Sequence, residues 1–284
     1  MGRARRLFSI LLLLGLAVGA AAADEVGLSF EGTFLQGALI TAHTDPGASV
    51  MVGDRSVRVS PDGWFLIGIG RDETGPVRID IVAPDGRHRS ETVAVQTRDY
   101  PVQRIDGLPE TKVTPPPEVL ERIRREAAMA SAARSLDDPR TDFLAGFIWP
   151  LEGPVTGVYG SQRILNGEPR RPHFGVDVAA PTGTSVMAPA DAVVTLVHPD
   201  MYYSGGTLIM DHGHGLSSTF IHLSRILVSK GQRVRRGEVV AEVGATGRAT
   251  GPHLDWRMNL FGTRLDPELI APRRPPSDAG PPAG

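Results

Sequence analysis

Residues 245–262 read ATGRATGPHLDWRMNLFG, and their centre sets His253 two positions before Asp255, between Gly, Pro and Trp. Side chains two positions apart on a β-strand point to the same face, so an imidazole and a carboxylate are expected to face one space. Three roles are open to Asp255: a metal ligand, a partner for the histidine, or a residue left over from a lost site.

Two other segments carry groups that suit the same space. RRPHFGVDVAAPTGTSV holds His173 and Asp177 as His-x-x-x-Asp, and TFIHLS places His222 at the end of an apolar strand. A zinc ion commonly takes three protein ligands from histidine and carboxylate and leaves one position for water. Three separate segments of this kind can therefore build a metal site.

Composition narrows the alternatives. The chain has 284 residues, no cysteine and a formal net charge of -2. The length is enough for two ordinary domains, and the charge gives no support to nucleic-acid binding. Without cysteine, disulfides, thiol nucleophiles and Cys-ligated zinc are excluded, so any metal must be held by His, Asp or Glu.

The N-terminus predicts export. It begins with three arginines, continues with an apolar run from Leu7 to Ala20 and ends in small residues before Asp24. That order is typical of a secretory signal peptide cleaved after Ala23, and the run is short for a membrane span. No stable membrane span is expected after cleavage.

Turn and strand signals divide the rest of the chain into two β-rich parts joined by a Pro-rich linker and helix. The C-terminal end, rich in proline and glycine, is expected to be disordered. The predicted parts are a signal peptide (1–23), a β-sandwich-like domain (24–112), the linker and helix (113–141), a second β domain (142–272) and a tail (273–284).

Over roughly Trp149 to Pro267 the second domain resembles the LytM, or lysostaphin-type, family of zinc metallopeptidases that cleave peptidoglycan. The resemblance rests on three blocks in the family's order: HFGVDVAAPTGTSVMAPADAVV, GGTLIMDHGHGLSSTFIHLS and KGQRVRRGEVVAEVGATGRATGPHLDW. It implies a compact antiparallel β domain whose groove runs over one sheet. The predicted fold class is therefore mainly β throughout.

Carried over position by position, the resemblance implies that His173 and Asp177 are metal ligands and that His222 and His253 are unliganded catalytic histidines. The family's last motif is normally His-x-His, and here Asp255 stands in place of its second histidine. A carboxylate is an acceptable zinc ligand, so Asp255 is predicted as the third one. Its extra negative charge predicts a weaker Lewis acid and a shift of preference toward harder ions. The neighbouring His212 and His214 are expected to be structural.

The resemblance implies a periplasmic, zinc-dependent endopeptidase that hydrolyses peptide cross-links of peptidoglycan with a metal-bound water as nucleophile. The alternative is a non-catalytic LytM-like regulator that binds peptidoglycan or activates a cell-wall hydrolase. The implied partners are peptidoglycan and, under the alternative, a cell-wall hydrolase or a protein of the division machinery.

Overall fold

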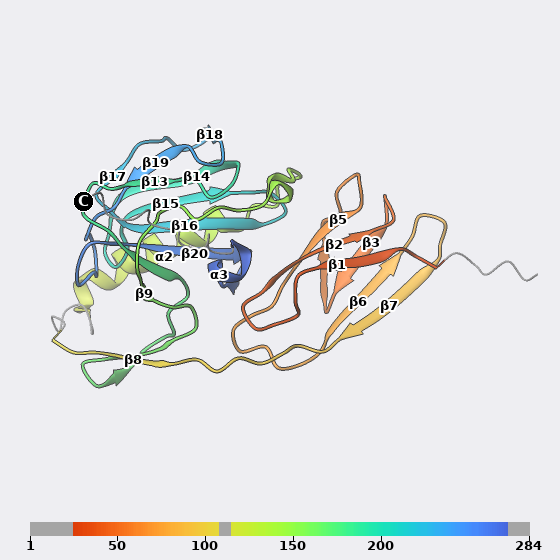
Figure 1. Ribbon diagram of the computed structural model, residues 1–284, viewed down its shortest axis with the longest axis horizontal. Coiled ribbons are helices and arrows are strands. Elements are labelled where there is room, and N and C mark those ends of the chain that lie inside the picture. The colour runs from red at the N-terminus through yellow and green to blue at the C-terminus, as the bar shows by residue number, and fades with distance from the viewer. Residues whose placement is uncertain (1–24, 108–114, 272–284) are drawn as a thin grey trace, which may run out of the picture.

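The computed structural model describes residues 25–107 and 115–271, which form two β-rich regions with a helix against one of them (Figure 1). The predicted signal peptide, the predicted tail and the start of the predicted linker lie outside the described residues. Among the residues that are described, no helix combines the length and the apolar character needed to cross a membrane.

The N-terminal region contains two antiparallel sheets around one apolar core. Alternation in its strands turns one side of each inward: Ile40 and Ala42 are fully buried in one sheet, and Ile79 and Ile81 in the other. One sheet has the order β1-β2-β5 and the other β4-β3-β6-β7. Their strands are β1 (Leu28–Glu31), β2 (Leu39–Thr44), β3 (Ser49–Val52), β4 (Arg55–Val57), β5 (Trp64–Gly68), β6 (Val77–Val82) and β7 (His88–Val93).

The main sheet of the C-terminal region is antiparallel, with the order β18-β14-β15-β16-β20-β12-β9, and β21 pairs with β20. A small sheet, β13-β19-β17, encloses the large apolar core with it. The strands are β9 (Val155–Gly157), β12 (Val176–Ala179), β13 (Ser185–Met187), β14 (Ala192–Met201), β15 (Gly205–Asp211), β16 (Leu216–Leu223), β17 (Arg225–Ile226), β18 (Arg233–Val234), β19 (Val239–Glu242), β20 (His253–Leu260) and β21 (Thr263–Leu265). Short helices η1 (Asp142–Ala145) and α3 (Pro267–Ile270) flank it.

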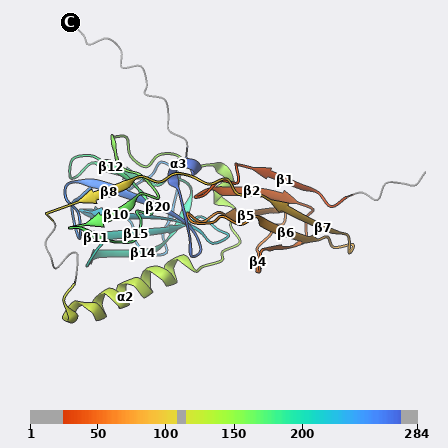
Figure 2. The same ribbon diagram turned by 90° about the horizontal axis from the view of Figure 1, so that it is seen from below.

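Several contacts join the regions, among them a strand pairing and an ion pair. Strand β8 (Val102–Ile105) runs parallel to β10 (Gln162–Leu165), which also pairs with β11 (Glu168–Pro169) (Figure 2). Arg98 forms an ion pair of 2.7 Å with the buried Asp266. The last strand described within the predicted range 24–112, β8, thus pairs with a strand in the range assigned to the second domain.

Helix α2 (Pro117–Arg134) lies along the main sheet (Figure 2). Proline at its start and Glu118 in its first turn favour initiation. Its Ala130 and Ala133 pack against Leu196, Met201 and Ile209 of β14 and β15. The antiparallel, mainly β fold predicted from the sequence is confirmed, and the helix covers part of one sheet face.

Candidate metal centre

The pairing of β12 with β20 brings two carboxylates together. Asp177 and Asp255 are direct partners in this antiparallel pair, so their side chains project side by side from one face. His173 lies just before β12, where its backbone N–H donates to the Ser161 carbonyl. Its Nε2 atom is 3.1 Å from Asp177 Oδ1 and 3.3 Å from Asp255 Oδ2.

This cluster of His173, Asp177 and Asp255 fits a divalent cation. All three residues are buried, and their candidate ligand atoms lie within 4.8 Å of one another. Ligand atoms around a tetrahedral zinc with bonds of about 2.0–2.2 Å are roughly 3.3–3.6 Å apart, close to the separations found. Asp177 Oδ1 is buried and, among the described residues, makes no well-aligned hydrogen bond despite its 3.1 Å approach to His173 Nε2, which leaves it available to an ion.

Two glycines leave room for these carboxylates. A Cβ at Gly175 would lie 2.4 Å from Asp255 Oδ1, and a Cβ at Gly157 would lie 2.2 Å from Asp177 Oδ2. Any side chain there would push the carboxylates out of place. Gly175, which lies between His173 and Asp177 in the sequence, is thus part of the site.

Sequence reasoning missed Arg257. Its guanidinium donates two hydrogen bonds to the Asp255 carboxylate, from Nε to Oδ1 at 2.9 Å and from Nη2 to Oδ2 at 2.6 Å. Burial alone would raise the pKa of Asp255, but Arg257 and His173 outweigh that effect and hold it well below its usual range. The available signal was spacing, since Arg257 follows Asp255 by two positions on one strand face.

His222 and His253 face each other beside the cluster, with ring centroids 4.8 Å apart. The Nδ1 atom of His222 lies 2.8 Å from the Thr246 carbonyl, and that of His253 lies 2.8 Å from the Gly251 carbonyl. Because a carbonyl only accepts, each Nδ1 carries a proton, and Nε2 is the atom of each ring that can take up or release one. The Nε2 of His253 is 3.8 Å from Asp177 Oδ1.

The local backbone holds His222 in an unusual conformation. Its φ is +66°, in the left-handed region that side chains rarely adopt, and such a residue costs of order 1–3 kcal/mol. Burial, with a contribution from His253, lowers the pKa of His222 to about 4 despite the opposing charge of Asp255. The ring is therefore neutral near pH 7.

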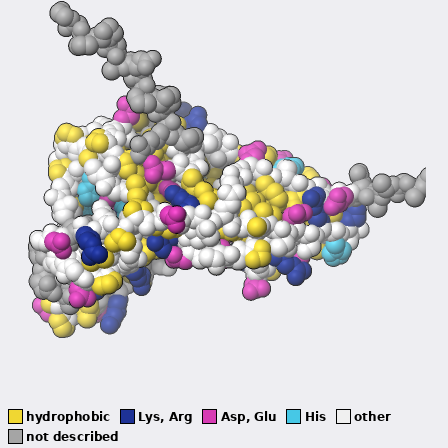
Figure 3. All heavy atoms as spheres, turned by 60° about the horizontal axis from the view of Figure 1, so that its bottom comes forward, with side chains coloured by type: hydrophobic (Ala, Val, Ile, Leu, Met, Phe, Trp, Pro, Cys, Tyr) yellow, Lys and Arg dark blue, Asp and Glu magenta, His cyan; other side chains and the backbone are white. Residues whose placement is uncertain are grey.

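A cavity of about 150 Å³ opens beside these groups, lined by Asp177, His222 and His253. Arg163 and Arg248 add positive charge to its lining. Gln103 of β8 also lines it, so the segment leaving the N-terminal region reaches the site. On the face drawn in Figure 3, acidic and basic side chains are mixed among the described residues.

The second histidine pair of the sequence lies away from the cluster. His212 is fully buried, with Nδ1 2.8 Å from the Asp191 carbonyl and Nε2 2.9 Å from the Ser218 hydroxyl. Nδ1 therefore donates and Nε2 accepts, which satisfies a neutral ring. His214 is buried in the adjoining turn, with a φ of +51°.

The segment that carries these residues matches a known protein family. The model of Peptidase family M23 matches residues 171–267. The peptidoglycan DD-endopeptidase ShyA of Vibrio cholerae is 41% identical over 108 residues, covering 34% of this chain and 24% of that protein. The cell division protein DipM of Caulobacter vibrioides is 29% identical over 167 residues, covering 57% of this chain and 26% of that protein. The chain spans about a quarter of the length of these relatives.

A solved structure extends the likeness beyond the matched segment. The crystal structure assigned to peptidase M23 from Pseudomonas aeruginosa has a TM-score of 0.67 and 31% identity, covering 84% of this chain and 95% of that chain. The likeness thus includes most of both β-rich regions. This chain belongs to peptidase family M23.

Proposed function

We propose that this protein is an exported, zinc-dependent endopeptidase that hydrolyses peptide cross-links of peptidoglycan. Family membership and relatives named peptidoglycan DD-endopeptidases support the reaction class and the substrate. The observation that carries the proposal is the buried cluster of His173, Asp177 and Asp255 beside two histidines that turn Nε2 away from their carbonyl partners.

In this proposal His173 holds the metal through Nε2, and Asp177 and Asp255 each hold it through a carboxylate oxygen. A zinc ion bound in this way supplies Lewis acidity toward a peptide carbonyl and lowers the pKa of a water. Arg257 draws negative charge from Asp255, which offsets part of the weakening that the extra carboxylate would cause.

His222 and His253 move the protons. Each has Nδ1–H fixed on a backbone carbonyl, so each can accept a proton at Nε2. One takes a proton from the attacking water. The other, once protonated, stabilises the developing negative charge or donates to the leaving amine.

The remaining assignments follow from the proposed substrate. Peptidoglycan lies outside the cytoplasmic membrane, which supports residues 1–23 as a signal peptide and the periplasm as the location. We propose residues 142–272 as the peptidase domain and residues 24–112 as the domain that positions it. Gln103 in the cavity lining supports a contribution of the preceding segment to the groove.

A second candidate function is a metal-free regulator that binds peptidoglycan or activates a cell-wall hydrolase. One observation favours it: both oxygens of Asp255 already accept hydrogen bonds from Arg257, which competes with an ion for that carboxylate. The relative named cell division protein DipM supports a partner in the division machinery.

Calorimetric titration of zinc into the metal-stripped chain separates the two candidates. We expect one zinc per chain, at least tenfold weaker binding in Asp255→Ala, and no change in the control Glu152→Ala, which removes an exposed carboxylate elsewhere. The zinc-loaded protein should then convert cross-linked peptidoglycan fragments to monomers. Absence of zinc binding in the unmutated chain would rule out the enzyme and favour the regulator.

A further inference from the structure

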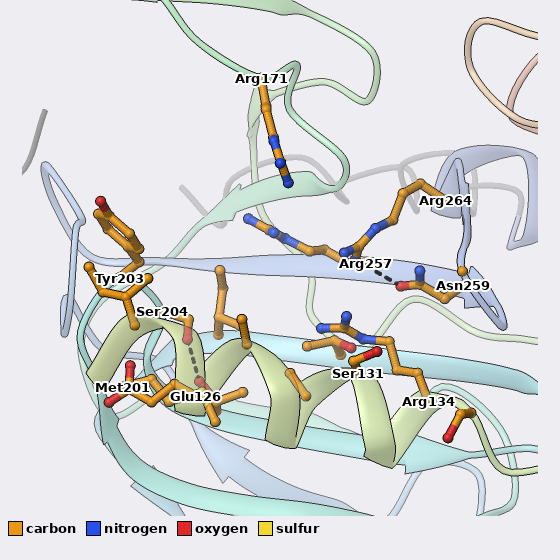
Figure 4. A pocket seen from close by; sticks show the side chains of 18 of the residues that line it. Glu126, Ser131, Arg134, Arg171, Met201, Tyr203, Ser204, Arg257, Asn259 and Arg264 are labelled. Atoms are coloured by element: carbon orange, nitrogen blue, oxygen red, sulfur yellow. Dashed lines mark hydrogen bonds between the residues drawn. The ribbon is translucent and has the colours of Figure 1, made fainter. Parts of the chain in front are cut away.

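A larger cavity, of about 480 Å³, lies between α2 and the face of the main sheet that carries the metal cluster (Figure 4). Its lining includes Thr207 of β15, Thr219 of β16 and Asn259 of β20. Arg257 also lines it, and the same side chain forms a hydrogen-bonded ion pair with Asp255. The cavity is therefore a continuation of the site along β20.

Positive charge dominates this cavity. Arg134 from α2, Arg171 from the segment before β12, and Arg257 and Arg264 from the sheet all line it, and Figure 4 shows their side chains converging. Among the described residues, no acid forms an ion pair with Arg134, Arg171 or Arg264.

The one acid in the described lining, Glu126, is already engaged. Its Oε1 accepts from Arg122 Nε at 2.6 Å, and its Oε2 accepts from the Tyr202 backbone N–H at 2.8 Å. Glu126 therefore ties α2 to the sheet and does not neutralise the arginines at the other end of the cavity.

Buried donors in the cavity lack acceptors. Arg134 Nε and Thr219 Oγ1 have no hydrogen-bond partner within the described part of the chain, and Thr219 is only 1% exposed. An unpaired buried donor costs about 1–3 kcal/mol, more when it is charged. Such donors around a cavity indicate a ligand that supplies acceptors.

The charges around the cavity also favour a negatively charged ligand. Burial, followed by the charges of Arg264 and Arg257, lowers the pKa of Arg134 to about 9. Burial and the charge of Arg257 lower the pKa of Arg264 to about 10. The guanidinium groups remain charged near pH 7 and repel one another, and an anion between them would relieve that repulsion.

We propose that this cavity binds a carboxylate of the peptide substrate, held by Arg134, Arg264 and the Thr219 hydroxyl. The planar carboxylate matches the fork of donors on each guanidinium. Arg257 lies two strand positions from Asp255, roughly 7 Å along β20, so the carboxylate would belong to a residue near the scissile bond. The inference rests on the proposed peptide substrate.

Equilibrium binding to the metal-stripped chain tests this subsite without cleavage. The probes are a cross-linked peptide dimer with free carboxylates and its carboxamide counterpart. We expect the free-carboxylate dimer to bind about tenfold more tightly, because hydrogen bonds to charged groups are worth about that factor. Arg134→Gln should remove this preference, Arg134→Lys should keep part of it, and Thr219→Val should weaken it about threefold.

Arg125→Gln is the matched control, since it removes an exposed arginine of the same helix. It should change neither affinity, and thermal unfolding should report a folded protein for every variant. Equal binding of the two dimers, failure of both to bind, or a preference that survives Arg134→Gln would overturn the subsite. Cleavage by the zinc-loaded chain is read separately: binding with preference but without cleavage contradicts the proposed enzyme and supports the subsite.

Discussion

Strand β20 has two faces with opposite chemistry. Its core face packs into the large apolar core, and its site face carries charged and polar groups. The core face consists of Leu254, Trp256, Met258 and Leu260, and the site face of His253, Asp255, Arg257 and Asn259.

The two faces are held by different physics. Burial of apolar area is non-directional and stabilises the core face wherever shapes fit. A buried carboxylate such as Asp255, which is 1% exposed, instead needs specific partners, because an uncompensated charge costs several kcal/mol. The core face therefore supports the fold, and the site face uses that stability to hold charges where chemistry needs them.

The largest expected effect lies on the core face. Trp256 is fully buried, with its ring edge-to-face against Trp149 at 5.6 Å between centroids. Trp256→Ala should lower the free energy of unfolding by about 4 kcal/mol, through lost burial and the cavity left behind. Urea unfolding of the metal-stripped protein measures this loss. If Trp256→Ala lost less free energy of unfolding than the milder control Trp256→Phe, the core face could not be what stabilises the fold.

The sequence predicted the general fold, which residues of the site lie together and a role for each of them. Strand and turn signals predicted β-rich regions, the family resemblance implied an antiparallel fold, and the structure brings His173, Asp177 and Asp255 together. Their roles as ligands, and those of His222 and His253 in catalysis, stay predictions.

What the sequence did not predict depends on contacts between distant segments. The parallel pairing of β8 with β10 joins segments with no local pattern in common. The position of α2 is set by packing of small side chains such as Ala130 and Ala133. Arg257 was overlooked because an arginine in a strand is usually solvated, and only the burial of this strand face shows that it pairs with Asp255, two positions before it.

The second prediction breaks the pairing on the site face. Arg257→Met leaves Asp255 without its guanidinium partner and should lower the free energy of unfolding of the metal-stripped protein by about 3 kcal/mol. Zinc should restore part of this loss, because an ion that binds only the folded state stabilises it. Chemical denaturation with and without zinc measures both effects.

Asp255→Asn combined with Arg257→Met provides the test of coupling. If the pair is a unit, the double variant should lose at least about 1 kcal/mol less than the sum of the single losses. Strict additivity would contradict the interpretation of Arg257 as the compensating charge.

The third prediction concerns His212, a buried polar group away from the site. Burial lowers its pKa to about 4, below that of the unfolded chain, so the folded state binds fewer protons. The stability that neutral His212 contributes is complete when the pH is above the pKa of the ring in the unfolded chain. It is lost as the pH falls toward the pKa of the ring in the folded protein. Between pH 7 and pH 5 the loss should be about 2 kcal/mol.

His212→Gln isolates this contribution. Asp211 opposes it, since burial raises its pKa to about 6, but that effect is present in both proteins and cancels in their difference. The variant should be less stable at pH 7, and the gap should close by about 2 kcal/mol at pH 5. A gap that stays constant across this range would show that the buried ring does not resist protonation.

The smallest effect is expected where the same pair chemistry faces water. Arg58 Nε bonds Asp137 Oδ1 at 2.8 Å, close to the Arg257–Asp255 distances, but the two side chains are 36% and 42% exposed. Arg58→Met removes the same group as Arg257→Met and should change the free energy of unfolding by less than about 0.5 kcal/mol, because water and salt already screen the pair. Both variants should be measured in one denaturation series at low and high salt. If Arg257→Met loses several times more free energy of unfolding than Arg58→Met, the extra loss comes from the burial of Asp255. Equal losses would mean that burial adds nothing to the cost of breaking the pair.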